Sequence, residues 1–135
     1  MIEVKVRHQG EVKFEITARQ HTLICDQPGE SCGADEGMTP PELFLSGLAS
    51  CAAFYAVAYL KKKGLQRPGV EVQATCEKAG PPARLDQFHI HVDVPGHLSE
   101  ADLAGVNDSV HRCLIHNTLL HQPHIDIDVR TPVAA

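Results

Sequence analysis

The feature that most constrains the fold is an uncharged stretch of eighteen residues, 43–60, near the middle of the chain. Eighteen apolar residues are about the length at which a membrane-spanning helix becomes a candidate. Small residues fill much of this stretch, however, and Lys61, Lys62 and Lys63 follow it directly. We therefore interpret it as the central, buried helix of a soluble protein and expect no association with a membrane.

A helix that is apolar on every side needs packing partners on every side. The chain has 135 residues, which suits a single domain, 1–135, with a modest core. No repeat, low-complexity tract or interdomain linker divides it. Covering all faces of a helix of about five turns in so small a domain takes a second subunit. The sequence therefore predicts a homodimer.

Charge and cysteine usage restrict the class of protein further. Twelve basic and seventeen acidic residues give a net charge of -5, so we expect no nucleic-acid partner, which would need a basic face. The N-terminus alternates charged and apolar residues and lacks the apolar core and cleavage site of a signal peptide. We therefore expect a cytoplasmic protein, in which five cysteines are reduced thiols and no disulfide scaffold.

Alternating apolar residues predict the strands. The pattern indicates a hairpin over residues 2–16 that turns at 8–10, and a third strand over 21–26. A second antiparallel pair is predicted at 70–76 and 88–94, and a last strand at 125–129. With two helices, this order predicts an α+β fold in which the helices pack on antiparallel sheets.

Local capping patterns mark where the two helices begin. Thr39, followed by prolines and by Glu42 at the third helical position, has the pattern of a capping box, and this helix is predicted to stop at Gly64. Ser99 is expected to cap a second helix, whose apolar stripe continues to about Leu120. The glycines, acids and proline between 27 and 39 indicate a loop.

Two cysteines, Cys51 and Cys113, are predicted to lie mid-helix among apolar neighbours, 62 residues apart. If the two helices pack together, the thiols meet in the layout of a two-thiol redox site. In such a site a thiolate attacks a peroxide oxygen, becomes a sulfenic acid and is captured by the second thiol as a disulfide. Taken singly, each cysteine is better explained as a small buried hydrophobe. Contact between the helices decides between these interpretations.

A family resemblance rests on the two segments around these cysteines, GMTPPELFLSGLASCAAFYAVAYLKKKGL and CLIHNTL. Both are similar to the OsmC/Ohr family of organic-hydroperoxide resistance proteins, especially its broad OsmC-like branch. The resemblance implies the OsmC-like fold, an intertwined homodimer with two interfacial sites, and thiol-dependent reduction of hydroperoxides without a bound cofactor. It also implies that Cys51 is the peroxidatic thiol, that Cys113 is the resolving thiol, and that an external dithiol reopens the disulfide.

The resemblance points to two further site residues. The hydroperoxide reductases carry a catalytic glutamate ten residues before the first cysteine, where this chain has Pro41. Glu42 lies nine residues before, on the opposite side of a straight helix, and its place in the capping box explains it better. Those enzymes also place an N-terminal arginine beside the thiolate, because an unperturbed thiol, with a pKa of about 8.5, is mostly protonated. Arg19 is preferred to Arg7 because its region is nearer in sequence to the loop that enters the helix.

The histidines are better explained as solvent-exposed or structural residues than as ligands of a metal ion. His89 and His91 share the solvated face of a strand, and His111, Cys113 and His116 are spaced so that they point apart on a helix. Neither C-x-x-C nor H-E-x-x-H occurs, so we expect no metal. His116 is interpreted as part of the helix end and of the site wall.

Three functions remain open from the sequence. The leading one is a thiol peroxidase, in which Leu48, Phe54, Tyr55 and partner residues form apolar walls that favour organic hydroperoxides. The second is an OsmC-like protein that binds a small apolar ligand or senses redox state without turnover. The third is a structural dimer with buried thiols. The loss of the glutamate at position 41 favours the second function, and the retention of both cysteines favours the first.

Overall fold

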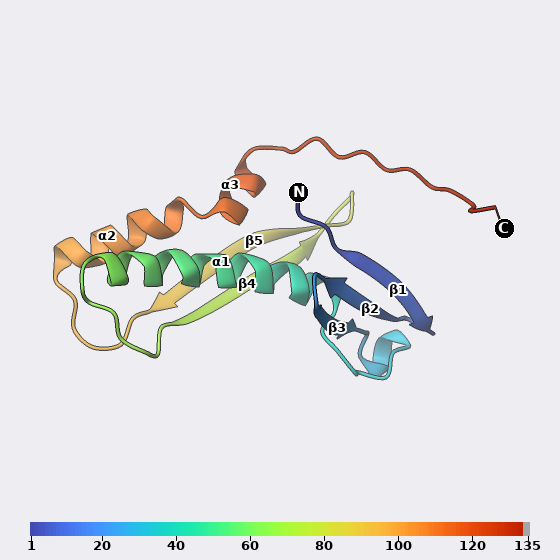
Figure 1. Cartoon of the computed structure of the whole chain (residues 1–135), viewed down its shortest axis with the longest axis horizontal. Coiled ribbons are helices and arrows are strands. Elements are labelled where there is room, and N and C mark those ends of the chain that lie inside the picture. The colour runs from blue at the N-terminus through green and yellow to red at the C-terminus, as the bar shows by residue number, and fades with distance from the viewer. Residues whose placement is uncertain (134–135) are drawn as a thin grey trace.

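The protein is described by a computed structural model covering residues 1–133, and it has the predicted α+β class (Figure 1). Two antiparallel sheets and three α-helices make up the fold. In chain order the elements are β1 (Lys5–Gly10), β2 (Lys13–Ala18), β3 (His21–Cys25), a short 3-10 helix (Gly29–Ser31), α1 (Pro40–Lys62), β4 (Glu71–Ala79), β5 (Arg84–Asp93), α2 (Glu100–His111) and α3 (Leu114–Leu120).

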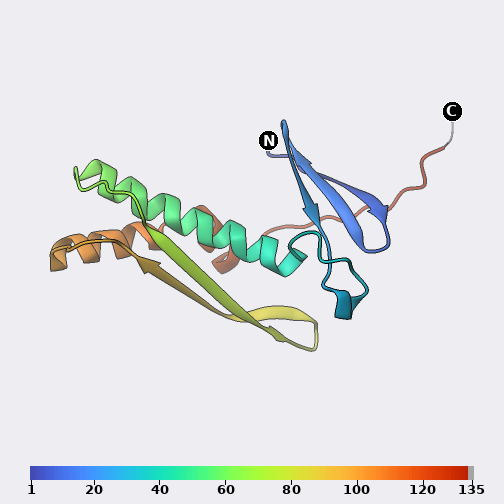
Figure 2. The same cartoon turned by 90° about the horizontal axis from the view of Figure 1, so that it is seen from below.

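The N-terminal sheet is antiparallel in the order β1-β2-β3, which confirms the predicted hairpin and third strand. The first turn lies at Glu11 and Val12, later than the sequence indicates, because β1 runs on to Gly10. The sheet lies beyond the N-terminal end of α1, away from the other helices (Figure 2). It makes no contact with a helix comparable to those that α1 makes with α2 and β4. Within residues 1–133, this sheet is therefore without a helix layer that packs extensively on it.

Asp26 organises the loop that joins this sheet to α1. The carboxylate is buried and accepts backbone hydrogen bonds from Gln27 at 2.7 Å, Ala34 at 3.2 Å and Glu36 at 3.1 Å. These hydrogen bonds, led by that from Gln27, lower the pKa of Asp26. The loop is thus a folded unit, and it fixes the direction in which the chain enters α1.

The start of α1 is the predicted capping box. Thr39 N donates to Glu42 Oε1 at 3.0 Å, and Glu42 N donates to the Thr39 hydroxyl at 3.4 Å. The helix ends as predicted, with Gly64 in the left-handed conformation at a φ of +70°. These local interactions set the phase of the helix and therefore the direction in which Cys51 projects.

A single stripe of α1 is fully buried within the chain. It consists of residues four apart, Leu48, Ala52, Ala56 and Leu60. Phe54, on another face, remains 68% exposed. The prediction that α1 is covered on every side is therefore not met by one chain alone. By length and composition α1 is the one helix of residues 1–133 that could cross a membrane, and the central helix of a soluble protein passes the same test.

The hairpin of β4 and β5 and the helix α2 enclose the main core with α1. Its buried members are Ala56, Leu60, Leu98 and Val106. The alternate side chains on β4 and β5 are exposed and largely polar, so the hairpin has the predicted wet face. This core holds α2 beside α1 and so brings Cys113, just after the end of α2, close to α1.

Gly105 allows α2 to lie close to α1. A Cβ atom at this position would clash with the ring of Tyr59. The Tyr59 hydroxyl donates to Asp102 Oδ1 at 3.0 Å, and the buried Ser109 hydroxyl donates to the Tyr55 carbonyl at 2.8 Å. Together these contacts fix the spacing of the two helices. Cys51 lies on α1, and Cys113 follows the end of α2.

Replacement of Gly105 by alanine is expected to lower the melting temperature by roughly 4–8 °C, because overpacking costs about 1–3 kcal/mol. Helix propensity alone predicts the opposite, since alanine is about 1 kcal/mol better than glycine inside a helix. Thermal unfolding followed by circular dichroism measures the sign of the change. A variant that melts at a higher temperature would contradict the close approach of Gly105 and Tyr59.

Two predicted elements differ in the structure. The second helix does not run unbroken to Leu120, because α2 ends at His111 and Cys113 takes a non-helical conformation, with a ψ of 131°, before α3 begins. The predicted last strand, 125–129, forms no strand within residues 1–133 and is exposed along its length. Its alternating pattern is that of a strand, but the single chain offers it no neighbour.

Candidate functional site

Cys51 and Cys113 lie side by side, because α1 packs against both α2 and α3. Cys51 is half-buried on α1, next to the buried Ala52, whereas Cys113 is 1% exposed. The two thiol groups lie close enough to affect each other's ionisation, and both are free thiols. The position predicted for Cys113 was wrong in detail, since it stands at the N-cap of α3 and not in the middle of a helix.

The surroundings of the two thiols differ. Burial raises the pKa of Cys113, and the contact with Cys51 adds to this effect. The backbone N–H groups of His116 and Ile115 face its sulfur and act in the opposite direction, but more weakly. Cys113 is therefore a protonated thiol at neutral pH, and a slow nucleophile until it loses its proton. A solute reaches the half-exposed Cys51 first.

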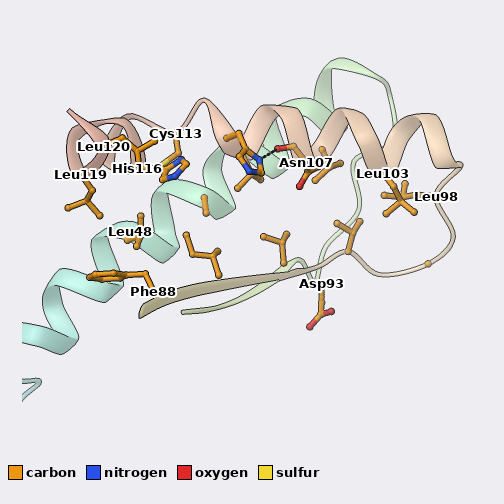
Figure 3. Close-up of a pocket in the computed structure, with 18 of the residues that line it drawn as sticks. Leu48, Phe88, Asp93, Leu98, Leu103, Asn107, Cys113, His116, Leu119 and Leu120 are labelled. Atoms are coloured by element: carbon orange, nitrogen blue, oxygen red, sulfur yellow. Dashed lines mark hydrogen bonds between the residues drawn. The ribbon is translucent and has the colours of Figure 1, made fainter. Parts of the chain in front are cut away.

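An open groove of about 1110 Å³ runs from Cys113 along α2 and β5 (Figure 3). Leu48, Phe88 and Leu119 lie at the end near Cys113, with Leu98 and Leu103 toward the other end (Figure 3). Most of the lining is apolar. Cys113 therefore faces Cys51 on one side and the groove on the other.

The lining of the groove differs from the apolar walls that the sequence predicts. Of the three wall residues predicted on α1, Leu48 lines the groove, whereas Phe54 and Tyr55 lie outside its lining. Their rings pack edge to face beside Cys51, with centroids 5.6 Å apart. Residues of β5 such as Phe88 were recognised from their alternation as strand residues, and only the packing of the hairpin on α1 shows that they form a wall. His116 lines the groove, in agreement with its interpretation as a wall residue.

Arg19 and Glu42 lie away from the thiols within one chain. Arg19 occupies the exposed turn between β2 and β3, with a φ of +55°. Glu42 is exposed, and the hydrogen bonds from Thr39, the backbone one first, lower its pKa. Across residues 1–133, neither side chain forms a hydrogen bond or ion pair with Cys51. Glu42 therefore has the capping role.

The remaining cysteines and histidines form no second centre in the described part of the chain. Cys25 is buried at the end of β3, Cys32 is exposed in the loop, and Cys76 is half-buried on β4. His89 and His91 are exposed on β5. Within residues 1–133, no group of three histidine, cysteine or acidic side chains could hold a metal ion.

Comparison with known proteins gives the family and the fold. The family model for OsmC-like proteins matches residues 33–128. A search of curated proteins finds no match. Similar crystal structures include a Psychrobacter arcticus 273-4 protein described as an osmotic stress induced and detoxification response protein, with a TM-score of 0.80 and 22% identity over 87% of this chain and 88% of that one.

Two further structures are similar. An OsmC-like protein from Mycoplasma pneumoniae has a TM-score of 0.76 and 20% identity over 90% of this chain and 89% of that one. An organic hydroperoxide resistance protein from Legionella pneumophila, also described as a predicted redox protein, has a TM-score of 0.67 and 18% identity over 88% of each chain. At these identities the structural matches establish the shared fold.

Proposed function

Because this chain belongs to the OsmC-like protein family, we propose that it is a thiol-dependent peroxidase that reduces organic hydroperoxides through Cys51 and Cys113. The observation that carries this proposal is the contact between the two thiols, one half-exposed and one buried. Two incidental core cysteines seldom meet in this way. The likeness to a Legionella pneumophila protein described as an organic hydroperoxide resistance protein supports the same assignment.

The proposed cycle has three steps. The Cys51 thiolate attacks the terminal oxygen of the hydroperoxide, the O–O bond breaks, and an alcohol leaves as Cys51 becomes a sulfenic acid. Cys113 then attacks the Cys51 sulfur, which forms the disulfide and releases water. An external dithiol reduces the disulfide by thiol exchange and restores both thiols. Because Cys113 is protonated, it does not compete with Cys51 for the peroxide, and it must lose its proton before it attacks the oxidised Cys51.

We also propose that the functional unit is a homodimer. A folded monomer of 14.7 kDa exposes about 6,900 Å². This chain exposes 10648 Å², roughly 3,700 Å² more than that expectation. The excess exposed surface includes an open face of α1, the unpartnered sheet β1-β2-β3 and the extended tail. Two copies that cover these surfaces would form an interface of the large, obligate kind.

The dimer gives Arg19 a route to the site. Its turn is at the tip of a sheet that, within residues 1–133, has no extensive packing on a helix, so this sheet is free to lie on the partner. An arginine that reaches Cys51 across the interface would stabilise the thiolate. Glu42 remains a capping residue in this proposal, and the position of the family glutamate is filled by Pro41. Five free thiols suit a reducing compartment, and we propose a cytoplasmic location.

An organic hydroperoxide such as cumene hydroperoxide is expected to react at least tenfold faster than hydrogen peroxide. Phe54 and Tyr55 flank Cys51 on α1, and burial of an apolar substituent against them contributes about 25 cal/mol per Å². Burial of about 60 Å² is enough for a tenfold effect. Consumption of each peroxide with a dithiol reductant measures the ratio, and equal rates would contradict the prediction.

A second candidate function is the binding of a small apolar ligand without turnover. The apolar groove of about 1110 Å³ favours it, because Cys51 is not part of its lining. This function predicts ligand binding that is unchanged when Cys51 is replaced by serine, and no consumption of peroxide. The peroxidase proposal predicts rapid consumption of peroxide that requires Cys51.

A further inference from the structure

His116 shares the groove with the buried thiol Cys113. It lies three residues beyond Cys113, on the first turn of α3, and both residues line the same end of the groove (Figure 3). The imidazole is half-buried and lies edge to face against His111, with ring centroids 5.9 Å apart. Cys113 therefore has Cys51 on one side and an imidazole in the groove on the other.

The proposed cycle does not yet include a group that takes the proton from the Cys113 thiol. Burial favours the neutral form of the Cys113 thiol, yet Cys113 must lose its proton to attack Cys51. Histidine is the side chain that exchanges protons near neutral pH in ordinary surroundings. The other titratable groups on the elements packed around this end are Cys51 on α1 and His111 on α2, whose Nδ1 lies 2.7 Å from the Asn107 carbonyl. Asp93, on β5, and His97, just beyond it, line the groove farther along.

We propose that the His116 imidazole is the base that takes the proton from the Cys113 thiol as its sulfur attacks the oxidised sulfur of Cys51. In the peroxidase cycle, on which this inference rests, the S–O bond of the Cys51 sulfenic acid breaks and the S–S bond forms. The imidazolium gives the proton that it took from Cys113 to the leaving hydroxide through solvent, so that water is released and the imidazole is restored. The Cys51 sulfur is reduced and the Cys113 sulfur is oxidised, so no further oxidant is needed.

The test uses 4,4′-dithiodipyridine in place of peroxide, on the full chain with Cys32 and Cys76 replaced by serine. Cys51 attacks the probe and releases one thiopyridone, and Cys113 then attacks the mixed disulfide and releases a second. The leaving thiopyridone needs no proton, so the second release reports proton loss from Cys113. Its rate in this parent protein is expected to level off near neutral pH. A rate that rises tenfold per pH unit up to pH 9 would overturn the proposal.

The variant His116→Gln is expected to slow the second release on the order of 100-fold and leave the first unchanged. Added imidazole is expected to restore the rate of His116→Ala, which a purely structural role for the side chain does not predict. The matched control is His121→Gln, an exposed histidine just past α3, whose second release stays at the parent rate. A second release of His116→Gln within threefold of the parent, or a failure of imidazole to restore His116→Ala, overturns the proposal.

The probe separates this inference from the peroxidase proposal. A protein that consumes no peroxide but shows a second release that depends on His116 contradicts the proposed function alone. A protein that consumes peroxide while its His116 variants keep the parent rate contradicts the inference alone.

Discussion

Replacement of Cys51 by serine is expected to abolish peroxide turnover, with a loss of at least about a thousandfold, because no other group in the cycle can attack the O–O bond. Replacement of Cys113 by serine is expected to leave one rapid oxidation per chain. The sulfenic acid on Cys51 then has no thiol to capture it, and excess peroxide oxidises it further. Stopped-flow measurement of peroxide loss, with intact-mass analysis of the product, distinguishes the two variants.

The control for these variants is Cys76→Ser, at a half-buried position on β4 outside the contact between the thiols. It is expected to keep the parent turnover. If Cys51→Ser and Cys113→Ser both keep full activity, the peroxidase mechanism is wrong and binding of an apolar ligand becomes the better function. The asymmetry between the two cysteines carries the distinction, since a general loss of stability would affect both variants alike.

At micromolar concentration the protein is expected to scatter light as a dimer, with twice the 14.7 kDa of one chain. The interface should bury on the order of 2,000 Å² or more in total. Phe54 is 68% exposed on the uncovered side of α1, beside Cys51, so Phe54→Glu should place an unpaired charge in this interface. Dissociation is expected to become at least about a hundredfold easier, because an uncompensated buried charge costs several kcal/mol.

Lys61→Glu is the matched control, since it changes charge at the exposed C-terminal end of the same helix. It is expected to remain a dimer over a dilution series in which Phe54→Glu separates into monomers. A parent protein that is a stable monomer at micromolar concentration would contradict the dimer and, with it, the route by which Arg19 reaches the site.

Local patterns in the sequence were enough to predict most elements. The capping box of Thr39 and Glu42 depends on residues three positions apart, and the alternation in β4 and β5 depends on the sheet's period of two. Both interactions are encoded by near neighbours, so the sequence carries them without knowledge of the fold. The family resemblance, and not periodicity, then assigned roles to the two cysteines.

Features that depend on packing could not be predicted in this way. No glycine or proline marks the break between α2 and α3, where Cys113 leaves the helix and its sulfur turns toward the amides of the next turn. The tail over 125–129 has the alternation of a strand, but a strand also needs an edge to pair with, and the single chain does not supply one. The groove arises where α2 and β5 face each other, which no local pattern records.

The most direct test of the central claim is to treat the reduced protein with one equivalent of organic hydroperoxide and map its peptides. The account predicts one disulfide, between Cys51 and Cys113, whose thiols already touch. A disulfide also requires Cα atoms about 4.4–6.8 Å apart, so formation of the bond reports the geometry of the site as well as its chemistry. A map in which Cys25 is linked to Cys32, with Cys51 left as a free thiol, would contradict the account.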